Sequence, residues 1–183
     1  MRHFLSHLSN FLIIAALASI FILISAMANQ NTSTDPNESL EKNGSPQEEF
    51  QNQDITTPKT EKTIDVGGRN LHSCVYGKGS PTVVLVSGFG APQAYWNPVV
   101  PELAAQTTVL TYDRAGIGKS EIGELPTHGK QAATDLHTLL KKLNLPKPYI
   151  VIGHSYGGSV VRLFASMYSD DIDGIILEDS QHA

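Results

Sequence analysis

Residues 153–157 read Gly-His-Ser-Tyr-Gly and directly follow the apolar run 149–152. The pattern Gly-x-Ser-x-Gly after a buried strand predicts a nucleophile elbow, a sharp strand-to-helix turn that presents a strained serine at the top of a sheet. Glycines flank the serine because the strand and the following helix pass too close for a Cβ atom. A helical pattern follows over residues 158–168, with an apolar face made of Val160, Phe164 and Met167.

The first 28 residues are expected to form a targeting signal. Residues 11–27 contain no charge, and Ala26-Met27-Ala28 is a small-x-small site of the kind that signal peptidase cleaves. A signal peptide cleaved after Ala28 and a retained signal anchor both fit this pattern. Either one predicts export, with the product secreted or periplasmic, or held at a membrane through residues 11–27 with the domain outside the cytoplasm.

Residues 29–59 are rich in Asn, Gln, Ser, Thr and Glu and contain almost no large apolar residue. Such a segment cannot bury enough surface to offset the entropy of ordering, so it is expected to be a disordered, mildly acidic linker. It could tether the domain to a membrane or be an inert leader. The folded part is expected to be residues 60–183, which suffice for one hydrophobic core.

Charge and metal-ligand patterns exclude several classes of function. The formal net charge is −5 and there is no basic cluster, which disfavours nucleic-acid binding. Cys74 is the single cysteine, so no intrachain disulfide can form, and it is expected to pack as a small apolar residue. The histidines at 72, 128 and 137 show no metal-ligand spacing, so neither a metal nor another cofactor is expected.

Alternating strand and helix patterns fill the folded part. The expected strands are residues 61–66, 71–76, 81–86, 107–112, 149–152 and 173–178. Helical spacing is expected around Trp96, Val99, Val100 and Leu103, and again after Thr127, which is expected to cap a helix with Leu136, Leu139, Leu140 and Leu143 on one face. This order predicts an α/β fold with a mainly parallel sheet, in which strand 149–152 is central.

Three motifs occur in a fixed order: Ser87-Gly88-Phe89-Gly90, the loop Asp-Arg-Ala-Gly-Ile-Gly-Lys-Ser at 113–120, and the elbow at Ser155. Together they resemble the α/β-hydrolase superfamily, in particular its esterase- and peptidase-like members. The resemblance covers about residues 63–183. It implies helices on both faces of the sheet and an α/β-hydrolase fold truncated after its sixth strand.

The resemblance also implies roles for individual residues. Ser155 would be the nucleophile, and the backbone N–H groups of Tyr156 and Phe89 would form the oxyanion hole. Ser87 stands where the family usually has histidine, which affects the pose of this loop but not the two donors. Asp113 and Arg114 would brace the end of the strand near the oxyanion loop rather than act in catalysis.

The acid and base are harder to assign. The family order is Ser, then Asp or Glu, then His. Asp179, at the end of the sixth expected strand, is a possible acid. His182 lies in a C-terminal dipeptide that could hardly hold an imidazole in productive geometry, so it is not expected to be the base.

Three hypotheses follow. The first is an exported serine hydrolase that acts without cofactor on a small ester, lactone or similar acyl bond through an acyl-enzyme on Ser155, and that has little activity as it stands. Serine at the elbow argues against the dehalogenase and epoxide-hydrolase branches of the family, which use aspartate. The second is a non-catalytic remnant or binding module. The third is an assembly in which a complementing chain supplies the missing strands and histidine.

Overall fold

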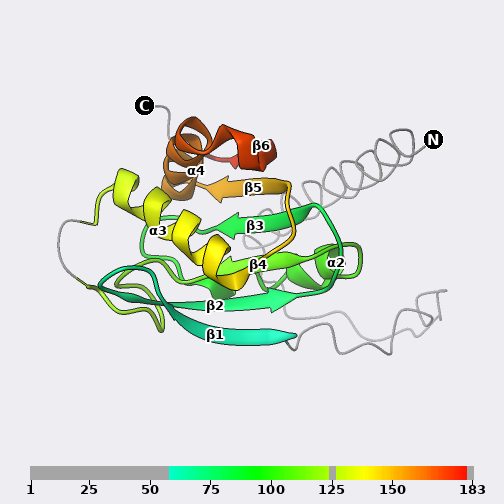
Figure 1. Ribbon diagram of the computed structural model, residues 1–183, viewed down its shortest axis with the longest axis horizontal. Helices are drawn as coiled ribbons and strands as arrows, with labels where there is room; N and C mark the ends of the chain where they lie inside the picture. Colours follow the sequence, from blue (N-terminus) through cyan, green and yellow to red (C-terminus); the bar gives the residue numbers. More distant parts are fainter. Residues whose placement is uncertain (1–57, 124–126, 181–183) are drawn as a thin grey trace, which may run out of the picture. The chain divides into compact units, whose positions relative to one another are not determined.

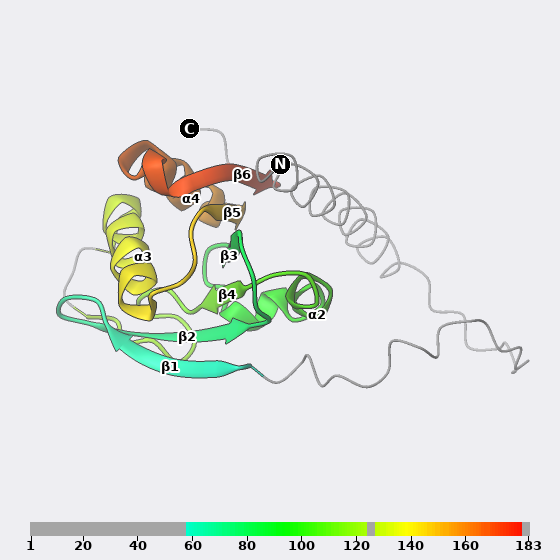
Figure 2. The same ribbon diagram turned by 45° about the vertical axis from the view of Figure 1, so that its right-hand side comes forward.

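The computed structural model describes residues 58–123 and 127–180, which contain a six-stranded sheet with helices on both faces (Figures 1 and 2). The strands are β1 (Thr60–Asp65), β2 (Asn70–Tyr76), β3 (Thr82–Val86), β4 (Val109–Tyr112), β5 (Tyr149–His154) and β6 (Ile172–Glu178). The helices are η2 (Gln93–Trp96), α2 (Val100–Ala104), α3 (Gly129–Leu143), α4 (Tyr156–Met167) and η3 (Ser169–Asp171).

The strand order is β1-β2-β4-β3-β5-β6. The β1/β2 and β2/β4 pairs are antiparallel, and the β3/β4, β3/β5 and β5/β6 pairs are parallel. The predicted mainly parallel sheet is therefore confirmed. Strand β5, which leads into the elbow, is interior, because it pairs with β3 on one side and β6 on the other. In the described sheet it lies next to the edge strand β6 rather than at the centre, where it was expected.

The core lies on both sides of the parallel strands. Every residue of β3 is buried, because neighbouring side chains of a strand point to opposite faces and both faces are covered. Helices α3 and α4 pack together over one face, whereas α2 lies across the other (Figure 2). The first interface includes Val84, Val86, Leu136, Leu140, Val160 and Phe164. This packing fixes the orientation of α4 relative to the end of β5.

Three helix boundaries differ from the sequence-based expectation. His128, not Thr127, caps α3, since its backbone is extended and its Nδ1 accepts a hydrogen bond from the Gln131 N–H at 3.2 Å. Helix α4 begins at Tyr156, earlier than expected, because the backbone changes from strand to helix at the single residue Ser155. The helical stretch near Trp96 is divided into η2 and the five-residue α2, with Pro101 in the first turn of α2.

The predicted targeting segment (1–28) and nearly all of the linker (29–59) lie outside the described residues, as does His182. Among the helices that the structure does describe, none combines the length and the apolar composition needed to cross a membrane.

Candidate active site

Ser155 occupies a strained turn between β5 and α4. Its backbone has φ 50° and ψ −119°, a region that residues with a side chain rarely adopt. The Ser155 N–H donates to the Glu178 carbonyl at 3.0 Å, and the Ser155 carbonyl accepts from the Gly158 N–H at 3.0 Å. The strained strand-to-helix turn predicted from the pattern is thus present.

Close backbone packing explains the glycines around Ser155. A Cβ atom on Gly157 would overlap the Val86 carbonyl oxygen at the end of the neighbouring strand β3. A Cβ atom on Gly153 would lie 2.6 Å from the Gly157 carbonyl oxygen. Both positions therefore require glycine for space, which holds α4 against the ends of β3 and β5.

The loop after β3 lies against the elbow. A Cβ atom on Gly88 would lie 2.9 Å from His154 Nδ1 and 3.3 Å from Ser155 Cβ. The rings of Phe89 and Tyr156 meet edge to face, with centroids 6.1 Å apart. The structure therefore brings the two predicted oxyanion-hole residues together beside Ser155. Tyr156 is the first residue of α4, where a backbone N–H has no acceptor within the helix.

Arg114 fastens the loop that carries Phe89. Its guanidinium is buried and donates to the carbonyl oxygens of Ser87 and Gly88, the latter at 2.6 Å. The guanidinium carbon also lies 5.4 Å from the centroid of the Tyr156 ring, within cation–π range. Arg114 thus links the Phe89 loop to the first residue of α4, as the resemblance implied.

Asp113 supports the loops behind the site. Its buried carboxylate accepts the backbone N–H of Gln93 at 2.7 Å and of Lys119 at 3.0 Å. Its Oδ2 also lies 3.3 Å from His72 Nδ1. These contacts fit the bracing role expected for Asp113.

Asp179 directly follows β6 and has a positive φ of 41°. Its side chain is exposed, and in the described part of the chain no hydrogen bond or ion pair joins its carboxylate to a histidine. The preceding Glu178 is half-buried and pairs in register with His154. Burial raises the pKa of the Glu178 carboxyl. Glu178 could not be predicted from the sequence pattern, because its position beside the elbow depends on strand register.

A cavity of about 240 Å³ adjoins the two predicted oxyanion-hole residues. Its lining includes Phe89, Tyr156, Ile117, Ile122, Tyr112 and Leu71. Arg69 and Asp135 also line it and form a buried ion pair, with Arg69 Nε 3.6 Å from Asp135 Oδ2. Burial raises the pKa of the Tyr112 hydroxyl. The Arg69–Asp135 pair could not be predicted from a local pattern, because the two residues are far apart in the chain.

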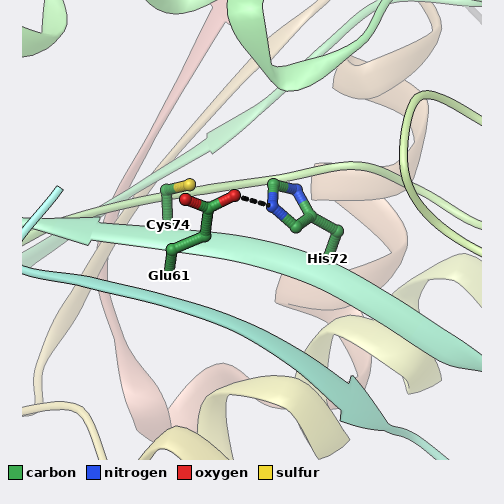
Figure 3. Close-up of side chains that lie close together, drawn as sticks. All are labelled: Glu61, His72 and Cys74. Atoms are coloured by element: carbon green, nitrogen blue, oxygen red, sulfur yellow. Dashed lines mark hydrogen bonds and ion pairs between the residues drawn. The ribbon is translucent and has the colours of Figure 1, made fainter. Parts of the chain in front are cut away.

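Glu61, His72 and Cys74 form a cluster of side chains that carry metal-ligating atoms, on strands β1 and β2 (Figure 3). The hairpin register places Glu61 opposite Cys74, and His72 points to the same face as Cys74 because it lies two residues away. A hydrogen bond from Lys119 lowers the pKa of Glu61 to about 2, and burial raises the pKa of the Cys74 thiol. The expectation that His72 belongs to no metal-ligand cluster overlooked this register.

Comparisons with known proteins agree with the fold. A family model described as alpha/beta hydrolase fold matches residues 81–183. The chain is 35% identical over 121 residues to the uncharacterized protein YqjL of Bacillus subtilis (strain 168), covering 65% of this chain and 47% of that protein. It is 34% identical over 127 residues to the soluble epoxide hydrolase of Corynebacterium sp. (strain C12), covering 68% of this chain and 43% of that enzyme.

Among solved structures, a thermophilic esterase from Thermogutta terrifontis with malate bound superimposes with a TM-score of 0.61 at 29% identity, covering 67% of this chain and 46% of the esterase. The chain spans less than half the length of each of these relatives. The sheet order, the elbow and the family match together show that the fold is hydrolase-like and that this chain belongs to the α/β-hydrolase family.

Proposed function

We propose that this chain carries the nucleophile and the oxyanion hole of a serine hydrolase that acts on small carboxylic esters or similar acyl bonds. The observation that carries the proposal is the positive φ of Ser155 at the start of α4, beside the loop that holds Phe89. A serine strained in this way at the end of an interior strand presents its hydroxyl rather than burying it.

The proposed reaction begins when Ser155 Oγ attacks the acyl carbon and its proton passes to a general base. The carbonyl oxygen becomes an oxyanion that accepts hydrogen bonds from the Phe89 and Tyr156 N–H groups. The alcohol leaves with a proton, and water then hydrolyses the acyl-enzyme to release the acid and restore the hydroxyl. In this scheme Arg114 positions the Phe89 loop through the carbonyl oxygens of Ser87 and Gly88.

Serine at position 155 favours acyl transfer over epoxide opening, even though one relative is a soluble epoxide hydrolase. A hydroxyl nucleophile combined with two backbone donors matches the attacked carbon and the developing oxyanion of an ester. The size of the neighbouring cavity, about 240 Å³, and its largely aliphatic and aromatic lining fit a short acyl or alcohol group.

The general base and the acid are not assigned by the described residues. From the sequence, Asp179 is a possible acid and His182 is not expected to be the base, and His182 lies outside the described part of the chain. The test therefore measures the nucleophile itself and supplies a base from solution as imidazole.

The experiment treats the full chain with a fluorophosphonate probe, with and without imidazole, and maps the modified residue by peptide mass spectrometry. Attack by Ser155 Oγ forms a P–O bond, fluoride leaves, and the proton passes to imidazole. We expect labelling at Ser155 that increases with imidazole concentration. Ser155→Ala should lose this label, whereas Ser159→Ala, which removes a hydroxyl from the next turn of α4, should keep it.

Labelling that is absent from Ser155 at every imidazole concentration, in protein that unfolds cooperatively, would contradict the proposal. Labelling of Ser155→Ala at the same rate as the native chain would contradict it as well. Either result would favour a binding module that keeps the scaffold without the chemistry.

A further inference from the structure

The cluster of Glu61, His72 and Cys74 combines three different donor atoms at short range. Glu61 projects from β1, and His72 and Cys74 project from β2, so that their side chains turn toward one another (Figure 3). One ligand atom from each residue lies within 4.8 Å of the other two. We propose that this cluster binds a zinc ion, with His72 Nε2, Cys74 Sγ and a Glu61 carboxylate oxygen as ligands.

The donor set and its spacing suit zinc. Thiolate, imidazole and carboxylate are the three ligand types that Zn²⁺ takes in proteins, at bonds of about 2.0–2.3 Å. Tetrahedral bonds of that length place ligand atoms about 3.3–3.8 Å apart. The present separations bracket this range, from 2.7 Å between His72 Nε2 and Glu61 Oε1 to the 4.8 Å limit of the cluster. Small movements of Glu61, on the edge strand, would bring the three donors to bonding distance.

The surroundings of His72 support its use as a ligand. Its Nδ1 lies 3.3 Å from Oδ2 of the buried Asp113, while Nε2 faces Glu61. A histidine that donates its other N–H to a carboxylate is the usual arrangement around protein-bound zinc, because the carboxylate fixes the ring and strengthens the ligand. Asp113 is itself held by the backbone N–H groups of Gln93 and Lys119.

Gln93 completes the surroundings on the sulfur side. Its Nε2 lies 3.3 Å from Cys74 Sγ and 3.0 Å from His72 Nδ1. When Nδ1 carries the proton and donates to Asp113, the Gln93 amide can donate to the sulfur instead. A donor at that position stabilises the thiolate that zinc binding creates when it replaces the thiol proton, which passes to solvent.

Lys119 is the cation that zinc would replace. Its Nζ lies 2.9 Å from Glu61 Oε1, and its side chain is 71% exposed, so it can withdraw into solvent. Glu61 is itself 46% exposed, which gives the ion a path from solvent and leaves room for water as the fourth ligand. Lys119 and zinc would therefore compete for the negative charge of the Glu61 carboxylate.

Bound zinc would hold the edge strand β1 against β2 and the loops next to Ser155. It would tie β1 to β2 directly and, through His72 and Asp113, to the loop that carries Arg114. Because the unfolded chain lacks this arrangement, binding would stabilise the folded protein by mass action.

The test titrates the untagged full chain, first stripped with a chelator, with Zn²⁺ against a chromophoric competitor and separately with Co²⁺. We expect one zinc site, a rise in melting temperature with zinc, and a thiolate-to-cobalt charge-transfer band. Cys74 is the single cysteine, so this band reports on Cys74 alone. Cys74→Ser should lose the band and weaken zinc binding at least roughly 10-fold, the lower end of what loss of a supporting group costs.

Lys119→Gln is the sharper variant, because the Lys119 side chain is exposed and the substitution leaves all three proposed ligands in place. The proposal requires this variant to bind zinc more tightly than the native chain does. If the cluster were only a structural hydrogen-bond network, the substitution would weaken that network and would not increase the affinity for zinc. His137→Gln removes a histidine outside the cluster and should leave zinc binding unchanged.

The proposal is overturned if cooperatively folded protein shows no thiolate band with cobalt. Zinc affinity that is unchanged in Cys74→Ser, or unchanged or weaker in Lys119→Gln, also overturns it.

Discussion

At the scale of single residues, the site depends on one strained backbone conformation. A non-glycine residue at φ 50° and ψ −119° costs on the order of 1–3 kcal/mol, and it persists only when its surroundings leave no alternative. Here the Ser155 N–H is held by the Glu178 carbonyl, and α4 is pressed against β3 and β5 at Gly157 and Gly153. The local pattern predicted this turn because the residues that identify it, Gly153, Ser155 and Gly157, lie within five positions of the chain.

Gly157→Ala should destabilise the protein. The new Cβ atom would overlap the Val86 carbonyl oxygen, which is backbone and cannot move without shifting β3. We expect the free energy of unfolding to fall by about 1–3 kcal/mol, the usual cost of overpacking a core, measured from urea denaturation midpoints. The label on Ser155 described above should fall with it, because α4 would be displaced.

Gly174→Ala is the matched control, since a Cβ atom at that position in β6 meets nothing within 4 Å. Its free energy of unfolding should stay within about 1 kcal/mol of the native value, on the stabilising side if anything. Equal destabilisation by both substitutions would show that the loss at Gly157 does not come from close packing at the elbow.

At the scale of elements, α3 and α4 form the layer that positions the elbow, and the contact between them includes a titratable group. His137 of α3 stacks on Tyr168, directly after α4, with ring centroids 3.7 Å apart and planes 11° from parallel. Its Nε2 lies 3.7 Å from Asp171 Oδ2 in η3. The apolar period of α3 predicted the helix, but it could not predict this stack, which joins residues from two elements.

The stability of this contact should depend on pH. Burial first, and then the charge of Lys141, lowers the pKa of His137 below its ordinary value of 6.5, while Asp171 opposes the shift and Lys147 adds to it. The unfolded chain therefore binds a proton more readily than the folded chain. The stabilisation is fully present above pH 6.5 and is lost as the pH falls through the folded-state pKa.

The measurement is the free energy of unfolding of the native chain and of His137→Gln between pH 8 and pH 5. We expect the difference between the two proteins to shrink as the pH falls below about 6.5. A difference that grows on acidification would mean that Asp171, rather than burial, dominates the environment of His137.

At the scale of the whole molecule, the sequence predicted the strands of the sheet better than the contacts between polar side chains of distant segments. Strands buried on both faces have continuous apolar runs, so β3, β5 and their order relative to the elbow could be derived from the chain alone. The zinc-ligand cluster depends instead on the register of the β1–β2 hairpin. The Arg69–Asp135 pair joins the residue before β2 to the middle of α3. Neither follows from local pattern, because both are contacts between distant segments.

Strand β6 lies at an edge of the described sheet. It pairs there only with β5, and it carries no lysine or proline that would hinder a further strand. Ile175, near the middle of β6, is 41% exposed. We expect the purified chain to self-associate with rising concentration and to bind an apolar dye, as measured by light scattering and fluorescence.

Ile175→Lys should reduce both signals, because it places a charge on the exposed edge. Leu163→Lys removes an apolar side chain of similar exposure (39%) from α4, away from that edge, and should have the smaller effect. A native chain that stays monomeric and binds no dye, or equal effects of the two substitutions, would show that the β6 edge does not drive association.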